Sequence, residues 1–121
     1  MFWYMAFIFG TSSLSRVPSP PAGLSDKHVH AALYAGLAAV TLRALAGGSW
    51  RRVTPGVSLG AALIATAYGV VDEFHQLLVP GRSFEIVDMA ADAIGALLAS
   101  GTLWTWGILR PRNPLGAPYA L

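Results

Sequence analysis

The residues of this sequence that could do chemistry gather in three short segments. They are Asp26-Lys27-His28-Val29-His30, Asp72-Glu73-Phe74-His75-Gln76, and the set Arg82, Asp88 and Asp92. Carboxylates beside cations and imidazoles are where pKa values shift, and such clusters are typical of functional sites. If the protein catalyses a reaction, we expect Glu73 or Asp72 to work with His75 as the acid–base pair.

The other polar residues of these segments are expected to bind a ligand. Arg82 and Lys27 would hold an anionic group through charge-assisted hydrogen bonds, and Asp88 would orient Arg82. The full set of expected ligand-binding residues is Lys27, His30, Tyr34, Gln76, Arg82, Asp88 and Asp92. Because no dense metal-ligand motif is present, we expect no metal and no other cofactor. A divalent ion held by Glu73, His75 and Asp88 stays an alternative.

A purely structural role is the competing interpretation for several of these charges. Asp26 is suited to cap a helix, and Lys27 to extend its ammonium toward the membrane interface. Asp88 lies in the first turn of a predicted helix, where a negative charge suits the helix dipole, or it pairs structurally with Arg82. Glu85 is more typical of a solvated loop charge.

The composition of the chain favours a membrane protein. Hydrophobic residues make up 55% and charged residues 12% of the 121 residues, and the mean hydropathy is +0.54. A soluble domain is usually about one quarter charged. The absence of cysteine excludes disulfides and thiolate metal sites, and no basic run of the kind that binds nucleic acid is present.

Four apolar stretches, separated by glycine, proline and serine, predict one all-α domain over residues 1–121. The predicted helices cover residues 2–13, 28–46, 57–79 and 86–109. The last three are long enough to cross a bilayer, which needs roughly 20 residues. The first is shorter, and we interpret it as the outer half of an incomplete membrane helix. The expected fold is therefore an integral membrane bundle of about four transmembrane helices.

Helices that alternate in direction would bring the three polar segments to the same end of this bundle. Asp26, His30 and Tyr34 are spaced four apart and share a helix face. His28 and His30 point to nearly opposite sides, so we do not expect them to bind one metal together. Small residues four apart predict close helix packing: Ala31-Ala35-Ala39, Ala61-Ala65-Gly69 and Ala91-Gly95-Ala99.

The distribution of basic residues predicts the orientation in the membrane. The two sides would carry Arg43, Arg51, Arg52, Arg110 and Arg112 against Arg16, Lys27 and Arg82. By the positive-inside rule, the side with more arginines is cytoplasmic. We therefore expect a multi-pass protein of the cell membrane with a cytoplasmic C-terminus and a polar site that faces outward.

Three motifs of the chain, taken in order, resemble those of a known family. They are Asp26-Lys27-His28 with His30 and Tyr34, then Tyr68-Gly69 with Asp72-Glu73-Phe74-His75-Gln76, then Val79-Pro80-Gly81-Arg82-Ser83 with Asp88, Asp92 and Gly95. Ile8-Phe9 with Ser12-Ser13 resembles the tail of that family's first helix. The pattern, which covers roughly residues 5–100, is similar to that of the VanZ-like family. The family usually has asparagine at the position of Asp92, and the first helix is short here.

The resemblance implies a small membrane protein of the cell envelope. The family is named after a protein that gives resistance to the glycopeptide antibiotic teicoplanin, and most members have no assigned reaction. We expect an outward-facing polar cleft that binds or acts on an amphiphilic envelope ligand, such as a lipid-linked precursor or a lipoglycopeptide, with membrane lipid as a further partner. Two alternatives stay open: a non-enzymatic membrane assembly module whose polar cluster is structural, and a small ion or proton pathway. The expected protein partner is another membrane protein or a second copy of this chain.

Overall fold

The computed structural model describes residues 1–15 and 20–110, and the regular secondary structure within them is entirely helical. The α-helices are α1 (Phe2–Ser12), α2 (Asp26–Leu45), α3 (Pro55–Gln76) and α4 (Ile86–Leu109). A short 3-10 helix, η1 (Trp50–Arg52), lies between α2 and α3. No strand occurs in these residues, so the all-α prediction is confirmed.

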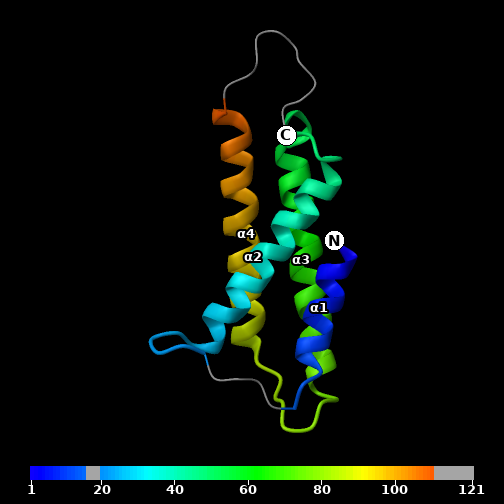
Figure 1. Cartoon of the computed structure of the whole chain (residues 1–121), viewed down its shortest axis with the longest axis vertical. Helices are drawn as coiled ribbons and strands as arrows, with labels where there is room; N and C mark the ends of the chain where they lie inside the picture. Colours follow the sequence, from blue (N-terminus) through cyan, green and yellow to red (C-terminus); the bar gives the residue numbers. More distant parts are fainter. Residues whose placement is uncertain (16–19, 111–121) are drawn as a thin grey trace.

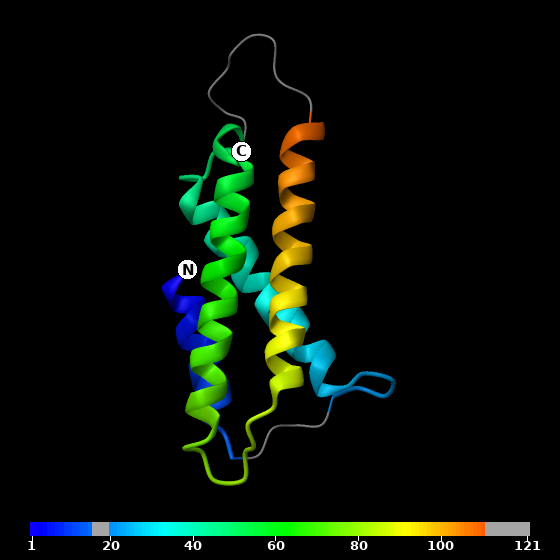
Figure 2. The same cartoon turned by 180° about the vertical axis from the view of Figure 1, so that it is seen from behind.

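The three long helices form an elongated bundle (Figures 1 and 2). α3 runs opposite to α2 and α4, and α2 slants across both of them. The short α1 lies beside the C-terminal half of α3 and runs in the same direction, since Tyr68 contacts Met5 and Asp72 contacts Ser12. The alternating helix directions expected from the sequence are therefore observed.

The ends of the helices follow local backbone chemistry. α4 has the predicted bounds, whereas α3 ends at Gln76, three residues earlier than predicted. Val79 precedes Pro80, and a residue before proline is disfavoured in the helical region. Gly81 then turns the chain with a φ of +80°, which favours glycine. The helix is interrupted ahead of Pro80 and Gly81, as the sequence indicated, but it ends three residues sooner than predicted.

The start of α2 differs from the prediction in one detail. Ser25, and not Asp26, is the N-cap residue. The Nδ1 atom of His28 accepts a hydrogen bond of 3.0 Å from the backbone N–H of Ser25. This contact keeps the exposed His28 ring outside the bundle, while His30 points inward. The two histidines diverge, as their spacing predicted.

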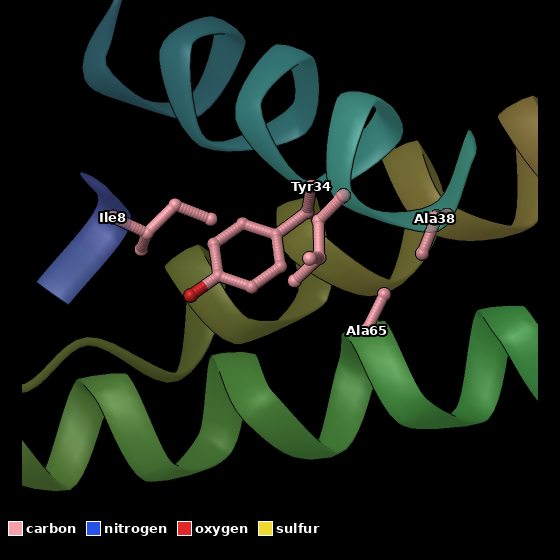
Figure 3. Close-up of a cluster of buried hydrophobic side chains, with 6 residues drawn as sticks. Ile8, Tyr34, Ala38 and Ala65 are labelled. Carbon is pink, nitrogen blue, oxygen red and sulfur yellow. The ribbon is translucent and has the colours of Figure 1, made fainter. Parts of the chain in front are cut away.

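The core at the middle of the bundle combines one large ring with small residues. Tyr34 is 1% exposed, and its ring lies among Ile8, Ala38 and Ala65 (Figure 3). Gly95 permits a close approach of α2 and α4, because a Cβ atom there would lie 2.1 Å from the carbonyl oxygen of Ala31. The predicted small-residue packing is thus observed between these two helices.

The outer surface of the long helices is strongly apolar. α3 and α4 are each long and apolar enough to cross a membrane. Large hydrophobic side chains on them are more than half exposed, including Leu63, Val71, Leu97 and Leu98. Such a surface is consistent with a membrane location, where the surrounding solvent is lipid.

A basic cluster marks one end of the bundle. The guanidinium groups of Arg43 and Arg110 lie over the ring of Trp50, at 4.2 and 5.5 Å from its centroid. Arg51 and Arg52 lie in η1 beside them. These residues share one end, as predicted, and Arg112 lies outside the described residues.

Candidate functional site

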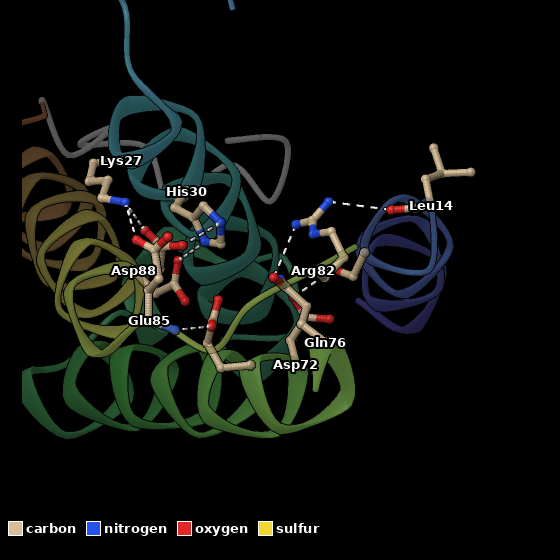
Figure 4. A network of polar contacts seen from close by, with 11 residues as sticks. Leu14, Lys27, His30, Asp72, Gln76, Arg82, Glu85 and Asp88 are labelled. Carbon is tan, nitrogen blue, oxygen red and sulfur yellow. Dashed lines mark hydrogen bonds and ion pairs between the residues drawn. The ribbon is translucent and has the colours of Figure 1, made fainter. Parts of the chain in front are cut away.

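The three polar segments meet at the opposite end of the bundle (Figure 4). Lys27 Nζ on α2 lies 2.9 Å from Asp88 Oδ1 on α4. The backbone N–H of Glu85 donates a 3.1 Å hydrogen bond to Glu73 Oε2 on α3. The prediction that these segments share one end is confirmed.

Lys27 is held by two carboxylates. Its ammonium lies 2.5 Å from Glu85 Oε2 as well as 2.9 Å from Asp88 Oδ1. Glu85 and Asp88 raise the pKa of Lys27, which lies in the first turn of α2. Glu85 is therefore not an isolated loop charge. Its side chain pairs with Lys27 on α2, and its backbone N–H donates to Glu73 on α3. The spacing of Glu85 follows no helix face, so the sequence pattern did not indicate these contacts.

His30 lies between two buried aspartates. Its Nδ1 atom is 2.9 Å from Asp92 Oδ1, and its Nε2 atom is 3.5 Å from Asp88 Oδ2. Both carboxylates come from α4, one turn apart, and their side chains are 1% and 8% exposed. Because Asp88 contacts Lys27 and His30, the expectation that it orients Arg82 is wrong.

Arg82 makes no ion pair with any carboxylate of the described residues, so the predicted pairing is also wrong. Its Nη2 atom donates a 3.0 Å hydrogen bond to Gln76 Oε1, and its Nη1 atom donates one of 3.5 Å to the carbonyl of Leu14. The Gln76 amide in turn donates to Asp72 Oδ2 at 3.5 Å. The turn after α3 directs Arg82 toward α1, and the Gln76 amide links it to Asp72.

Asp72 has a partner that the sequence analysis did not single out. The hydroxyl of Ser12, on α1, donates a buried 2.6 Å hydrogen bond to Asp72 Oδ2. The only signal in the sequence was the pair of serines that ends the first apolar stretch. Ser12 thus brings the short helix into the polar end of the bundle.

His75 faces α1. Its ring stacks on Phe9 with centroids 4.3 Å apart, and its Nε2 atom lies 2.9 Å from Ser13 Oγ. Two residues apart on a helix, Glu73 and His75 are separated by about 200° around the axis. The structure therefore brings His30, and not His75, to the carboxylates. It does not bring together the alternative metal set of Glu73, His75 and Asp88.

A cleft of about 650 Å³ opens at this end between α1, α2, the end of α3 and the following turn. Its apolar wall is formed by Phe7, Ile8, Val29 and Leu33. Its polar lining includes Ser12, His30, Asp72, Gln76, Arg82 and Asp88. The cleft therefore offers hydrophobic and hydrogen-bonding surfaces side by side, as small-molecule sites commonly do.

Two further acids lie deeper than this lining. Glu73 is 0% exposed and Asp92 is 1% exposed. Together with His30 they offer three potential metal-ligand atoms that lie within 4.8 Å of one another. Of the expected ligand-binding residues, Tyr34 is fully buried one turn beyond His30, and its ring also borders the cleft.

The comparisons with known proteins identify a family. A family model described as VanZ/LLP1 matches residues 2–109. The match covers all four α-helices and every residue of the candidate site. No curated protein and no solved structure matches the chain significantly.

Proposed function

The chain belongs to the VanZ-like family, and from this premise we propose that its cleft binds the anionic head group of a membrane amphiphile, such as a lipid-linked envelope precursor. The single observation that carries the proposal is that Arg82 has no anionic partner among the described residues. This half-buried cation lines the cleft and has only neutral hydrogen-bond partners among the described residues, Gln76 and the Leu14 carbonyl. A phosphate can therefore take the bidentate hydrogen bonds that a guanidinium offers.

Lys27 is less suited than Arg82 to hold the ligand. Its ammonium already contacts Glu85 and Asp88. In this proposal Lys27 neutralises the acids at the rim of the cleft, while Arg82 and the Gln76 amide contact the head group. The lipid tail would pack against Phe7 and Leu33 on the apolar wall.

The proposed placement in the membrane follows from the same surfaces. α2, α3 and α4 would cross the bilayer with spans at residues 28–46, 57–79 and 86–109, and α1 would occupy the outer half. The polar end would face outward and the Arg43, Arg51 and Arg52 end would face the cytoplasm. This arrangement is supported by α1, whose hydrogen bonds to α3 lie in the polar half of that helix.

An ion or proton pathway has less support. A pathway needs polar groups across the full depth of the membrane. In the basic half of the bundle, the buried polar side chains among the described residues are the hydroxyls of Thr41, Ser58 and Ser100. The acids and histidines are confined to the cleft end, which favours binding over transport.

Binding of two lipids with the same tail tests the proposal. Native mass spectrometry of the purified protein would compare a polyprenyl phosphate with the uncharged polyprenol. We expect the wild type to prefer the phosphate. Arg82→Gln should reduce its affinity by about tenfold or more, because a charge-assisted hydrogen bond is lost. Arg82→Lys should be intermediate, since a point charge cannot reproduce the fork.

Arg51→Gln is the matched control, because Arg51 is exposed at the opposite end of the bundle. It should retain the preference for the phosphate. Equal binding of both lipids by the wild type would reject the proposal. So would an Arg82→Gln variant that binds the phosphate normally but melts at a lower temperature, which would make Arg82 a structural residue.

A further inference from the structure

We propose that His30, Glu73 and Asp92 bind a divalent transition-metal cation, Mn²⁺ or Zn²⁺, behind the polar lining of the cleft. The three residues come from α2, α3 and α4 and offer ligand atoms within 4.8 Å of one another. This site is separate from the Arg82 site, and it does not depend on the identity of the lipid.

Burial of the two acids is the first observation. Glu73 is 0% exposed and Asp92 is 1% exposed. Within residues 1–15 and 20–110, neither Glu73 Oε1 nor Asp92 Oδ2 has a hydrogen-bond partner. Buried carboxylates in proteins are normally paired, fully hydrogen-bonded or bound to a metal. These two oxygens therefore have coordination capacity that the described part of the chain leaves unused.

The unused oxygen of Asp92 points at the helix that carries Glu73. A Cβ atom at Gly69 of α3 would lie only 2.8 Å from Asp92 Oδ2. Gly69 is four residues before Glu73, so both lie on the same face of α3. The glycine allows the carboxylate of α4 to approach α3 at this depth, next to the acid of that helix.

The neighbouring cations do not neutralise this pair. Lys27 contacts Glu85 and Asp88, and Arg82 contacts Gln76 and Leu14. Among the described residues, His30 is the only cation-forming side chain that contacts Asp92, and Glu73 makes no ion pair. A divalent cation would balance both acids at once.

Surrounding contacts already orient Glu73 and His30. The backbone N–H of Glu85 holds Glu73 Oε2 at 3.1 Å, which leaves Oε1 available. Asp88 Oδ2 lies 3.5 Å from Nε2 of His30. Metal-binding histidines almost always donate their second N–H to a carboxylate or a carbonyl. Asp88 is therefore placed to support His30 as a ligand.

The donor set selects the class of ion. One imidazole nitrogen and two carboxylates suit Zn²⁺ or Mn²⁺ better than soft, thiolate-preferring ions. Ligand atoms around a tetrahedral Zn²⁺ at about 2.1 Å lie about 3.4 Å apart. Since all three ligand atoms already lie within 4.8 Å of one another, small side-chain rotations would bring them to that spacing.

Binding of the metal salt alone tests the inference. The purified full-length chain, stripped with a chelator, would be titrated with MnCl₂ or ZnCl₂ by calorimetry, and the bound metal measured after gel filtration. We expect one ion per chain. His30→Gln, Glu73→Gln and Asp92→Asn should each weaken binding by at least about tenfold. The controls His28→Gln and Asp26→Asn change exposed residues at the same end of α2 and should bind like wild type.

Two results would overturn the inference: a wild-type chain that binds no stoichiometric ion, or controls that lose binding as much as the three cluster variants do. If the cluster variants fail to fold, the wild type alone decides. Its Co²⁺ form should then have the visible absorption bands of a low-symmetry site with nitrogen and oxygen ligands, and a spectrum of free aqueous Co²⁺ would reject the site. No lipid is added, so failure here leaves the Arg82 experiment unaffected.

Discussion

The hydroxyl of Ser12 donates a 2.6 Å hydrogen bond to the carboxylate of Asp72, and this contact joins the short helix α1 to the polar end of α3. Two further hydrogen bonds hold α1 in place. The Tyr4 hydroxyl donates to the Leu33 carbonyl on α2, and the Tyr68 hydroxyl on α3 donates to the Met5 carbonyl. Because α1 forms one wall of the cleft, its attachment decides the shape of the candidate site.

Ser12→Ala should destabilise the protein and loosen α1. The substitution leaves a buried carboxylate oxygen without its closest donor, which costs about 1.5–3 kcal/mol for a bond to a charged group. Unfolding in detergent, followed by helical circular dichroism, measures the change. Ser13→Ala is the control, because Ser13 is exposed, and a loss as large as that of Ser12→Ala would contradict the buried role.

Gly95→Ala should separate α2 from α4. The added Cβ would meet the Ala31 carbonyl oxygen at 2.1 Å, so the backbones must move apart. Overpacking of this kind typically costs about 1–3 kcal/mol. Gly101→Ala on the same helix is the matched control: nothing lies within 4 Å of its Cβ position, so its melting temperature should be unchanged or higher.

Lys27→Met should lower the melting temperature by a few degrees, because it leaves the largely buried Asp88 without its ammonium partner. Lys27→Arg should restore most of the loss, since it keeps the positive charge. Asp26→Asn, one residue earlier and exposed, should have no effect. A wild-type melting temperature for Lys27→Met would show that the ion pair contributes nothing.

A reporter fused after Leu121 should be active in the cytoplasm. The prediction rests on the arginines at the Trp50 end of the bundle, which the positive-inside rule assigns to the cytoplasm. A second reporter in the turn near Gly81 should report the outside. Exchange of the two activities would reverse the orientation and place the cleft in the cytoplasm.

Helix periodicity predicted the parts of this structure that depend on sequence spacing alone. The divergence of His28 from His30 follows from about 100° per residue, and the common depth of the three polar segments from a rise of about 1.5 Å per residue. The bounds of α4 follow instead from the length of its apolar stretch and from the proline that comes after it in the sequence. Alternating helix directions then bring residues distant in the sequence to the same depth, as the contact of His30 with Asp92 confirms.

The partners of individual charges could not be predicted in the same way. Arg82 and Glu85 lie in the turn between α3 and α4, where no period fixes the direction of a side chain. Proximity in sequence suggested that Arg82 pairs with Asp88. The turn instead directs Arg82 toward α1 and Glu85 toward Lys27. The contact of Ser12 with Asp72 depends on how α1 docks, which the sequence pattern does not encode.

The turn between α3 and α4 has a thermodynamic consequence for the two proposed sites. Arg82, which would hold the anion, is three residues before Glu85, whose backbone N–H orients Glu73. A ligand that displaces this turn therefore acts on the cation site as well. Linkage is reciprocal: if an occupied Arg82 changes the affinity for the metal by some factor, the metal changes the affinity for the anion by the same factor. Head group and cation would then be effectors of each other, through nine residues of connecting chain between Gln76 and Ile86.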